Sequence, residues 1–559
     1  MPKITGGRFI AEFLNAQGVT AFFFVPTMLS RALAEMDEMP IKRVLTHGEK
    51  AAAYMADGYA RASGRPGICA AQAVGAANLA AGLRDAYMGH SPVIALTGGR
   101  WGHQKHKINY QEMDDFPIFT QVTKANFQVD SVGRMPDLLR QAFREATSGT
   151  PAPVNLLFAG KEGDIEHEEA DLNLIAEQTF TQVPAFRPAP EAARVAEAAR
   201  ILKAAQRPVI VVGGGARLSG AGPEVLKLAE TLSIPVATSL NAMSLVPDNH
   251  PLYIGVPGTY SRSCANRILL RADLVLYIGS QTAGQVTHFW KIPAAGTPVI
   301  QIGIDAADLG RNYPNAVSLL GDAKTALQAL MSAVAVGGAP GARNAEWIEE
   351  VSMVVREYRA EVKPLRDSDA VPMRPERICR ELGDWLPQDA IVVCDTGHAG
   401  MWSAQQLWVN KPWDFIRAAG SLGWAFPASL GAKVAMPKKP VVCFTGDGGF
   451  WYHLQELETA VRCGIPTVTV VNNNNSLNQE TTIFQHAYGG KPSQKQGEMW
   501  HFSQVNFAAI AETMGALGIR VTKPGELRSA LDRAVSSGRP AVVEVMSQIE
   551  ALAPNAWVG

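Results

Sequence analysis

A metal and phosphate site is predicted between Gly446 and Asn474, in the carboxyl-terminal third of the chain. An apolar run over 441–445 is predicted to be a buried strand. The glycines after it allow the backbone to approach an anion closely and aim N–H groups at it. Asp447 supplies a carboxylate oxygen beside that anion. A carboxylate, an amide and a diphosphate are ligands that suit magnesium better than zinc.

Amide side chains are expected next to this turn. A second apolar run over 465–471 is predicted to be a strand, and four asparagines, Asn472 to Asn475, follow it. Open parallel sheets bind ligands at the carboxyl ends of their strands, which places these amides beside Asp447. GDG turns and asparagine-rich loops are each common without a ligand. The order strand, GDG, helix over 454–462, strand and amides is more specific, and it favours a metal-diphosphate site.

This order resembles the signature of thiamine diphosphate (ThDP) enzymes, in which GDG is followed, after a helix and a strand, by NN. In the acetolactate synthase branch, the resemblance implies that Asp447, the Asn474 side chain and the Ser476 backbone carbonyl bind the metal. The run of four asparagines allows this pair to shift by one residue. The further cofactor contacts that the resemblance implies here are Gly446, Gly448, Gly449, Leu477 and Asn478.

A carboxylate that could activate such a cofactor is Glu49, in the segment THGEKAAAYMADGYARASG over 46–64. Taken alone, a glutamate that opens an Ala-rich helix is usually a partner of the helix dipole. The segment resembles the one that carries the activating glutamate of ThDP enzymes. There, the carboxyl stabilises the protonated pyrimidine nitrogen of the imino form, whose basic nitrogen removes the thiazolium C2 proton.

Two more segments resemble cofactor loops of the same family. AGSLGWAFPASLGA, over 419–432, resembles the segment in which a bulky apolar residue keeps ThDP bent. Leu422 takes that position, with ordinary core packing as the alternative, and Gly420 lets the backbone pass close to the pyrimidine. VVCDTGHAG, over 392–400, resembles the loop that holds the diphosphate, and its candidates are Gly397, His398 and Ala399.

The substrate pocket is predicted from polar loop residues. NYQEMDD, over 109–115, resembles a pocket segment of acetolactate synthases and also one of oxalyl-CoA decarboxylases. A solvated loop is the alternative for this segment, and a surface carboxylate is the alternative for Glu498 in KQGEMWHF. The catalytic candidates in these loops and after the metal loop are Tyr110, Gln111, Glu112, Glu480 and Glu498.

Length and composition indicate an α/β protein of about three domains. The chain has 559 residues, of which 47% are hydrophobic and 18% charged. Strands and helices alternate in three blocks separated by polar, Pro-bearing stretches, which predicts three doubly wound parallel-sheet domains. The resemblance assigns them as a pyrimidine-binding domain over 1–165, a middle domain over 191–340 and a diphosphate- and magnesium-binding domain over 373–548. Residues 549–559 are expected to form a tail that acts as a lid over the site.

The middle domain carries an ambiguous glycine motif. GGGAR, over 213–217, follows an apolar strand and precedes a helix, but it lacks the full GxGxxG spacing and the acidic partner expected further on. In the ThDP family this domain holds FAD, ADP or the ADP part of coenzyme A, or nothing. Adenine-nucleotide binding and simple packing both remain open for this motif.

Charge and cysteine usage limit the kinds of partner and the compartment that are expected for the chain. A formal net charge of -1 argues against a general electrostatic role on nucleic acid or an anionic membrane. The six cysteines are scattered and form no CxxC, which fits reduced thiols in the cytoplasm. The N-terminal segment is amphipathic rather than a signal peptide, and no apolar run approaches the length of a membrane span.

The chain is therefore expected to be a ThDP- and Mg²⁺-dependent enzyme that makes or breaks a carbon-carbon bond next to a carbonyl. Acetolactate synthase-like and 2-hydroxyacyl-CoA lyase-like chemistry, on 2-oxo acids or 2-hydroxyacyl-CoA, are both expected from the resemblance. Glu49 and Asp447 fall in different domains, so the resemblance implies sites at the subunit interface of a homodimer or homotetramer. The alternatives are a ThDP- and FAD-dependent 2-oxo acid oxidase or decarboxylase and, from another class, a non-catalytic ThDP-binding homologue.

Overall fold

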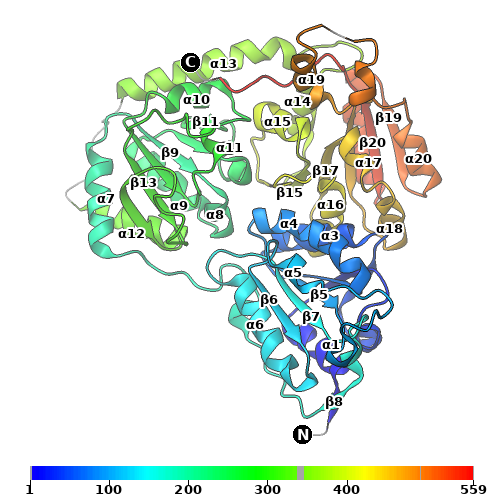
Figure 1. Ribbon diagram of the computed structural model, residues 1–559. Helices are drawn as coiled ribbons and strands as arrows, with labels where there is room; N and C mark the ends of the chain where they lie inside the picture. The colour runs from blue at the N-terminus through cyan, green and yellow to red at the C-terminus, as the bar shows by residue number, and fades with distance from the viewer. Residues whose placement is uncertain (1–2, 337–344, 492, 558–559) are drawn as a thin grey trace.

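Three six-stranded parallel sheets, each flanked by helices, make up the computed structural model (Figure 1). The model describes residues 3–336, 345–491 and 493–557. Figure 1 shows the first sheet at the bottom of the view, the middle sheet at the left and the third sheet at the right. This architecture confirms the predicted fold class of three doubly wound α/β units.

The first sheet has the strand order β3-β2-β4-β5-β7-β6. A small antiparallel pair, β1 (Ile4–Thr5) with β8 (Glu169–Ala170), lies outside it. Its strands are β2 (Ala21–Phe24), β3 (Lys42–Leu45), β4 (Gly67–Ala71), β5 (Val93–Gly98), β6 (Ala125–Val129) and β7 (Val154–Phe158). Its helices are α1 (Gly6–Ala16), α2 (Ser30–Glu35), α3 (Glu49–Ser63), α4 (Ala76–Met88), α5 (Phe116–Phe119) and α6 (Met135–Thr147).

The middle sheet has the order β11-β10-β9-β12-β13-β14. Its strands are β9 (Pro208–Val212), β10 (Val236–Thr238), β11 (Tyr253–Gly255), β12 (Leu274–Ile278), β13 (Val299–Gly303) and β14 (Asn315–Leu320). Its helices are α7 (Ala192–Ala204), α8 (Gly214–Leu218), α9 (Gly222–Leu232), α10 (Ser263–Leu269), α11 (Gly284–Thr287), α12 (Ala323–Ala335) and α13 (Ala345–Arg366).

The third sheet has the order β16-β15-β17-β18-β20-β19. Its strands are β15 (Ala390–Cys394), β16 (Trp413–Arg417), β17 (Val441–Gly446), β18 (Val468–Asn473), β19 (Leu517–Val521) and β20 (Ala541–Met546). Its helices are α14 (Pro375–Trp385), α15 (His398–Gln406), α16 (Ala425–Ala435), α17 (Asp447–Trp451), α18 (Glu456–Arg462), α19 (Thr481–Ala487), α20 (Phe507–Thr513) and α21 (Leu527–Ser536).

Strand order places a crevice in each sheet. The chain of the third sheet runs from β15 outward to β16 and then returns to β17 on the other side of β15. The first sheet does the same with β2, β3 and β4, and the middle sheet reverses between β9 and β12. At such a reversal, the loops after neighbouring strands diverge and leave a ligand crevice at the carboxyl ends of the strands.

Two elements begin later than predicted. The strand predicted over 465–471 is β18, which begins at Val468 because Pro466 has no N–H to donate to a ladder, and which extends to Asn473. Two of the four asparagines therefore lie inside the strand rather than in the loop after it. The helix predicted over 454–462 begins at Glu456. The predicted end of the middle domain at residue 340 lies outside the described residues.

The tail crosses from the third sheet to the middle one. The carbonyl of Ala551 accepts an N–H from the Asn478 side chain, and that of Pro554 accepts one from Gln405. The carbonyl of Trp557 accepts an N–H from the buried Asn266 side chain at 2.9 Å. Figure 1 shows this segment in red, running beneath α13 towards α10. A function of the tail as a lid stays a prediction, and residues 558 and 559 lie outside the described part of the chain.

Helix α3 of the first unit packs directly on helix α16 of the third unit. A Cβ atom at Gly431 would lie 1.8 Å from the carbonyl oxygen of Met55, and one at Gly58 would lie 2.0 Å from that of Ala428. The two helix backbones therefore touch, and one hydrophobic core continues across the contact. The same contact buries His453, which lies edge-on to the Tyr54 ring with the centroids 5.4 Å apart.

Neither ring nitrogen of His453 has a hydrogen-bond partner. Burial lowers the pKa of His453 to about 4, and the nearby charge of Lys50 acts in the same direction.

We expect Gly58→Ala to destabilise the chain. Alanine normally stabilises a helix interior by about 1 kcal/mol relative to glycine, but here the methyl group would overlap the backbone of α16. Overpacking of this kind costs roughly 1–3 kcal/mol, so the melting temperature should fall by several degrees. Gly525→Ala is the matched control, because a Cβ atom there has open space. Equal melting temperatures for Gly58→Ala and the parent chain would contradict the observed helix contact.

Acidification should weaken the fold partly through His453. An unfolded imidazole has a pKa of roughly 6.5, whereas that of folded His453 is about 4. The unfolded chain therefore binds this proton first, and stability falls as the pH drops below 6.5, by roughly 1.4 kcal/mol per pH unit until about pH 4.

His453→Gln should flatten the decline of melting temperature between pH 7 and pH 5. His486→Gln, a change on an exposed helix face, serves as its control. An unaltered slope in His453→Gln would show that this ring is not buried in its neutral form.

Candidate active site

The predicted metal ligands converge at the carboxyl ends of β17 and β18. Asp447 is buried at the start of α17, and one of its oxygens accepts the backbone N–H of Ser476 at 2.8 Å. Burial raises the pKa of Asp447 to about 7, although the backbone N–H groups that its carboxylate accepts, that of Ser476 first, oppose the shift. The Ser476 hydroxyl, also buried, has no partner. A divalent cation beside this carboxylate would keep it ionised.

The asparagines of the run differ in whether their side chains have hydrogen-bond partners. Asn473 is fully buried and committed to its own fold, because its amide donates to Glu544 at 2.7 Å and its oxygen accepts the N–H of Asn475. The side-chain oxygens of Asn472 and Asn474 are shielded from solvent and lack any hydrogen-bond partner. Alternation along a strand puts these two on the opposite side from Asn473. A buried acceptor without a donor is costly unless a ligand satisfies it, so the geometry suits a cation bound by Asn474.

Glycines create the space for an anion beside these ligands. Gly397 has a φ of 70°, which only glycine adopts readily, and a Cβ atom there would lie 2.9 Å from the side-chain oxygen of Gln479. A Cβ atom at Gly448 would lie 2.4 Å from Leu477, whereas one at Gly446 would meet no atom within 4 Å. The turn is thus tightly lined on one side and open at Gly446, as a diphosphate cradle requires.

The other predicted cofactor contacts differ in whether their polar atoms are free to bind a ligand. His398 opens α15, its Nδ1 atom has no partner, and burial lowers its pKa to about 4, so the ring is neutral at pH 7. Ala399 is buried behind it. The Asn478 side chain is already engaged, with the tail carbonyl of Ala551 and with the hydroxyl of Thr481.

Asp395 is a site residue that the sequence reasoning did not single out. It is buried at the end of β15, where it accepts N–H groups from Thr396 at 2.8 Å and Gly423 at 3.1 Å and the hydroxyl of Thr445 at 3.1 Å. Burial raises the pKa of Asp395 to about 7. One side chain thereby joins the loop after β15 and the end of β17 to the loop that carries Leu422. Its position directly after a buried apolar strand was the available signal.

The Leu422 loop is shaped by Gly423. This glycine has a φ of 85°, and a Cβ atom there would lie 2.5 Å from the Cβ atom of Tyr452. Leu422 itself is half-buried, and Gly420 lies where a Cβ atom would meet the end of Met88 at 3.5 Å. The loop therefore presents an apolar side chain from a backbone that has little freedom.

Glu49 lies in the crevice of the first sheet. It opens α3, and its carboxylate accepts an N–H from the Asn78 side chain at 3.2 Å. Gly75 leaves room for it, since a Cβ atom there would lie 2.5 Å from a Glu49 oxygen. Glu49 follows β3 of the first sheet, whereas Asp447 follows β17 of the third. The two predicted halves of the site thus belong to the crevices of different sheets.

The loop over 109–115 contains two side chains with a shielded oxygen that lacks a hydrogen-bond partner, those of Gln111 and Asp115. Gln111 has a φ of 59°, a strained value for a non-glycine residue, and its side-chain oxygen is shielded and unpaired. Glu112 is turned back on its own loop, where it accepts the N–H groups of His106 and Asn109, which lowers its pKa. The Tyr110 side chain is 74% exposed. Of the three candidates Tyr110, Gln111 and Glu112, Gln111 is therefore the one best prepared for a ligand.

The other carboxylates of the pocket differ in burial. Asp115, at the end of the same loop, is buried, and burial raises its pKa to about 6 although the charge of Arg100 opposes the shift. Glu480 is half-buried in a short helical turn after the metal loop. Glu498 is exposed. Among the described residues, no cluster of three or more His, Cys, Asp and Glu side chains could hold a metal.

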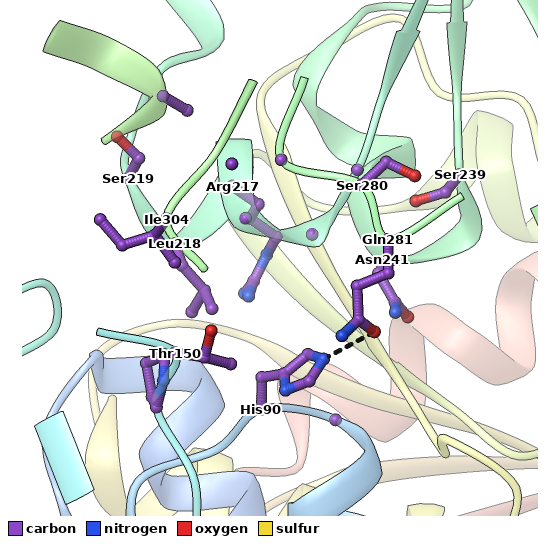
Figure 2. A pocket seen from close by; sticks show the side chains of 18 of the residues that line it. His90, Thr150, Arg217, Leu218, Ser219, Ser239, Asn241, Ser280, Gln281 and Ile304 are labelled. Atoms are coloured by element: carbon purple, nitrogen blue, oxygen red, sulfur yellow. Dashed lines mark hydrogen bonds between the residues drawn. The ribbon is translucent and has the colours of Figure 1, made fainter. Parts of the chain in front are cut away.

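A cavity of about 250 Å³ lies between the middle sheet and the other two units (Figure 2). It opens at the reversal between β9 and β12, and loops after β9, β10, β12 and β13 line it. The Nε2–H of His90 in the first unit donates to the side-chain oxygen of Gln281 in the middle unit at 3.0 Å. Figure 2 shows the polar side chains of Ser239, Asn241 and Ser280 around the same space.

The glycines of GGGAR have a packing role. A Cβ atom at Gly213 would lie 2.2 Å from the carbonyl oxygen of Gly279, and one at Gly279 would lie 2.4 Å from the backbone nitrogen of Ala216. The turns after β9 and β12 therefore press against each other. Acidic residues also line the cavity, but they are Asp305 and Asp308 after β13 and Asp322 after β14, far along the chain from the motif. Sequence spacing alone did not identify them.

Comparison with known proteins identifies the family. Three family models match in order: the N-terminal TPP binding domain over residues 4–118, the central domain over 195–330 and the C-terminal TPP binding domain over 395–545 of thiamine pyrophosphate enzymes. The chain belongs to the thiamine pyrophosphate enzymes. Thiamine pyrophosphate is ThDP, so the predicted family is confirmed. Asp447 and Asn474 lie in the C-terminal ThDP-binding domain, and Glu49 lies in the N-terminal one.

The chain is also similar to curated acetolactate synthases along nearly its whole length. It is 33% identical to a probable acetolactate synthase large subunit of Methanocaldococcus jannaschii, over 97% of this chain and 91% of the relative. It is 31% identical to the large subunit of Mycobacterium tuberculosis, over 96% and 86%. It is 29% identical to the isozyme 2 large subunit of Escherichia coli K12, over 99% and 97%. The expectation that the chain is an enzyme is thereby confirmed. No helix among the described residues is long and apolar enough to cross a bilayer.

Proposed function

We propose that this ThDP enzyme is a Mg²⁺-dependent carboligase that joins or cleaves a carbon-carbon bond next to the carbonyl of a 2-oxo acid. The observation that carries the proposal is the unpaired Asn474 oxygen in the same crevice as the buried Asp447 carboxylate. Similarity to acetolactate synthases supports a 2-oxo acid as the donor. Cleavage of a 2-hydroxyacyl-CoA stays an alternative substrate class within the same chemistry.

The proposed metal ligands are hard oxygen donors. Asp447, the Asn474 side chain and the Ser476 carbonyl would hold Mg²⁺, and the diphosphate would complete its coordination. The N–H of Ser476 already fixes the Asp447 carboxylate against the second loop. The neutral His398 ring can donate a hydrogen bond to a phosphate oxygen without adding charge.

Bound ThDP supplies a nucleophilic carbon and an electron sink for the bond next to the carbonyl. The chain supplies proton control and position. Glu49 would hold the protonated pyrimidine nitrogen, and Asn78 would keep the Glu49 carboxylate oriented. Leu422 would fill the bend of the cofactor, and Gln111 would direct its amide towards the reacting oxygen. Glu480 and Glu498 stay candidates for proton transfer in the loops above.

A second copy of the chain would complete the site. Glu49 and Asp447 occupy different crevices of one chain, and large apolar side chains are exposed at both. Val74 and Tyr110 are exposed beside the first crevice, and Met499 and Phe502 beside the metal loop. Exposed apolar groups of this size commonly mark interfaces. We therefore infer a homodimer, or a tetramer built from it, in which the N-terminal domain of one subunit faces the C-terminal domain of the other.

The cavity of the central domain is proposed to bind an adenine nucleotide. It lies at the reversal of strand direction where doubly wound sheets bind nucleotides. Asp305 and Asp308 can accept hydrogen bonds from ribose hydroxyls, but they would repel a phosphate on the ribose. Two of the arginines in the lining, Arg61 and Arg217, are paired with carboxylates of the chain. The lining thus favours FAD or ADP over coenzyme A, which carries a 3′-phosphate.

Glu49→Gln is expected to separate binding from catalysis. Glutamine keeps the size of the side chain but cannot stabilise a protonated pyrimidine nitrogen, so turnover of pyruvate should fall about 10²- to 10⁴-fold. ThDP affinity, measured by calorimetry with Mg²⁺ present, should change little.

Asn474→Ala is expected to have the opposite effect, on binding rather than on catalysis. It should weaken ThDP affinity when Mg²⁺ is present and leave ThDP affinity without Mg²⁺ unchanged. Asn78→Ser, beside Glu49 but without a proposed role at the metal, is its control for binding. Full turnover in Glu49→Gln would remove Glu49 from the mechanism. Equal metal dependence in Asn474→Ala would remove Asn474 from the metal site.

Nucleotide preference can be read from thermal shifts. FAD and ADP should raise the melting temperature of the nucleotide-free protein, and coenzyme A, which shares the adenine but adds a 3′-phosphate, should raise it less. An absorbance spectrum of the purified protein distinguishes bound flavin from colourless ADP. A shift with coenzyme A as large as that with ADP would overturn the proposed preference.

A further inference from the structure

A carboxylate of the N-terminal domain holds the loop that carries Leu422 in the C-terminal domain. Asp85, in the last turn of α4, is fully buried. One of its oxygens accepts the backbone N–H groups of Gly420 at 3.0 Å and Ser421 at 2.9 Å, and the other accepts that of Ala419 at 2.9 Å. Three successive backbone N–H groups of the C-terminal domain therefore donate to a single side chain of the N-terminal domain.

The charge of Asp85 is only partly balanced by an arginine within the contact. Arg61 donates to Asp85 at 3.1 Å and forms two hydrogen bonds of 2.7 Å with Asp57, which is also fully buried. The indole N–H of Trp424 donates to Asp57 at 2.8 Å. One arginine thus serves two carboxylates, and the three loop amides supply what Asp85 lacks. Without them, Asp85 would be a buried charge with one shared partner, which is a costly state.

The same loop is also held from its other side. Arg417, at the end of β16, donates to the carbonyls of Ala418 at 2.6 Å and Ala419 at 3.3 Å. Asp395 accepts the N–H of Gly423 at 3.1 Å. Leu422 therefore stands between two residues whose backbone N–H groups are fixed by different carboxylates. Its own position follows from those anchors.

Adhesion between the domains does not need this network. Close packing of α3 on α16 already joins them through a continuous apolar core. A buried ion network is a weak source of stability, because desolvation offsets most of its attraction. Its directional hydrogen bonds do specify a unique loop conformation. The geometry of Asp85 is therefore better explained by loop position than by stability.

We propose that Asp85 is a positioning residue for the cofactor. It orders residues 419–421 before ThDP binds, so that Leu422 and the Gly420 backbone already stand where the cofactor meets them. The loop then loses little conformational freedom on binding, which favours affinity. This inference rests on the proposed contact between the Leu422 loop and ThDP.

Asp85→Asn tests the proposal with almost no change in volume. Asparagine keeps one acceptor oxygen but turns an NH₂ group towards N–H donors of the loop, so at least one anchor is lost. ThDP affinity at saturating Mg²⁺, measured by calorimetry, should weaken about tenfold or more, in the range of a lost buried hydrogen bond.

Asp248→Asn is the matched control. Asp248 is a buried carboxylate of the central domain that accepts an N–H from Arg262 and the backbone N–H of Val409 in the C-terminal domain. It joins two domains as Asp85 does, but away from the Leu422 loop. ThDP affinity should stay unchanged in this variant. Equal weakening in both variants would show a general loosening of domains and overturn the proposal.

A double-mutant cycle with Leu422→Ala separates position from general damage. If Asp85 acts through Leu422, the effect of Asp85→Asn on ThDP affinity should shrink to about threefold or less once Leu422 is removed. Additive effects would overturn the proposal. Failure of the parent chain to bind ThDP would instead reject the proposed function, whereas normal binding by Asp85→Asn would reject this inference alone.

Hydrogen exchange of the cofactor-free parent chain gives a readout that needs no variant. The amides of 419–421 should exchange slowly before any ThDP is added, because their acceptor belongs to the chain itself. Asp85→Asn, where it folds, should lose this protection while helix α16 keeps its own. Fast exchange of these three amides in the cofactor-free parent would overturn the proposal even if Asp85→Asn failed to fold.

Discussion

Buried carboxylates that accept backbone N–H groups organise the functional half of this molecule. Asp395, Asp447 and Asp85 each lie out of water and each receive amides from a loop distant in sequence. A buried charge is tolerated only when such donors surround it. The loops therefore cannot relax away from the crevice without exposing an unpaired charge. This constraint makes the site a property of the fold rather than of flexible side chains.

The cofactor family could be predicted from the sequence, and the same motif predicts where a metal beside the cofactor would bind. Strand, GDG and asparagines in order gave Asp447 and the asparagine run, because ligands at the ends of parallel strands follow from local pattern alone. Which asparagine would bind the metal could not be predicted from the sequence. In the structure β18 extends through Asn473, whose side chain donates to Glu544, and this leaves the oxygens of Asn472 and Asn474 without partners. Pro466 could have indicated where the strand begins, since proline cannot pair within a sheet.

Other features depended on contacts that no local pattern encodes. Asp85 lies within an ordinary amphipathic helix, and only the packing of two domains brings it to residues 419–421. The cavity of the central domain joins loops from all three units, and its acids follow β13 and β14 rather than the glycine motif. Strand order likewise came from the structure, because sequence predicts alternating elements but not which strands lie side by side. Each of these features depends on contacts between residues far apart in the chain, which is why the sequence did not predict it.

The first and third sheets share one strand order, with the second strand at the edge, the first beside it and the last two exchanged. The middle sheet follows another order. Agreement in the order of all six strands makes the two outer units alike in topology, and each has a crevice at its reversal point. The proposed acid Glu49 lies in one of these units and the proposed metal ligand Asp447 in the other. A cofactor with two chemically different ends would need two such crevices, and a chain that repeats one topology provides them.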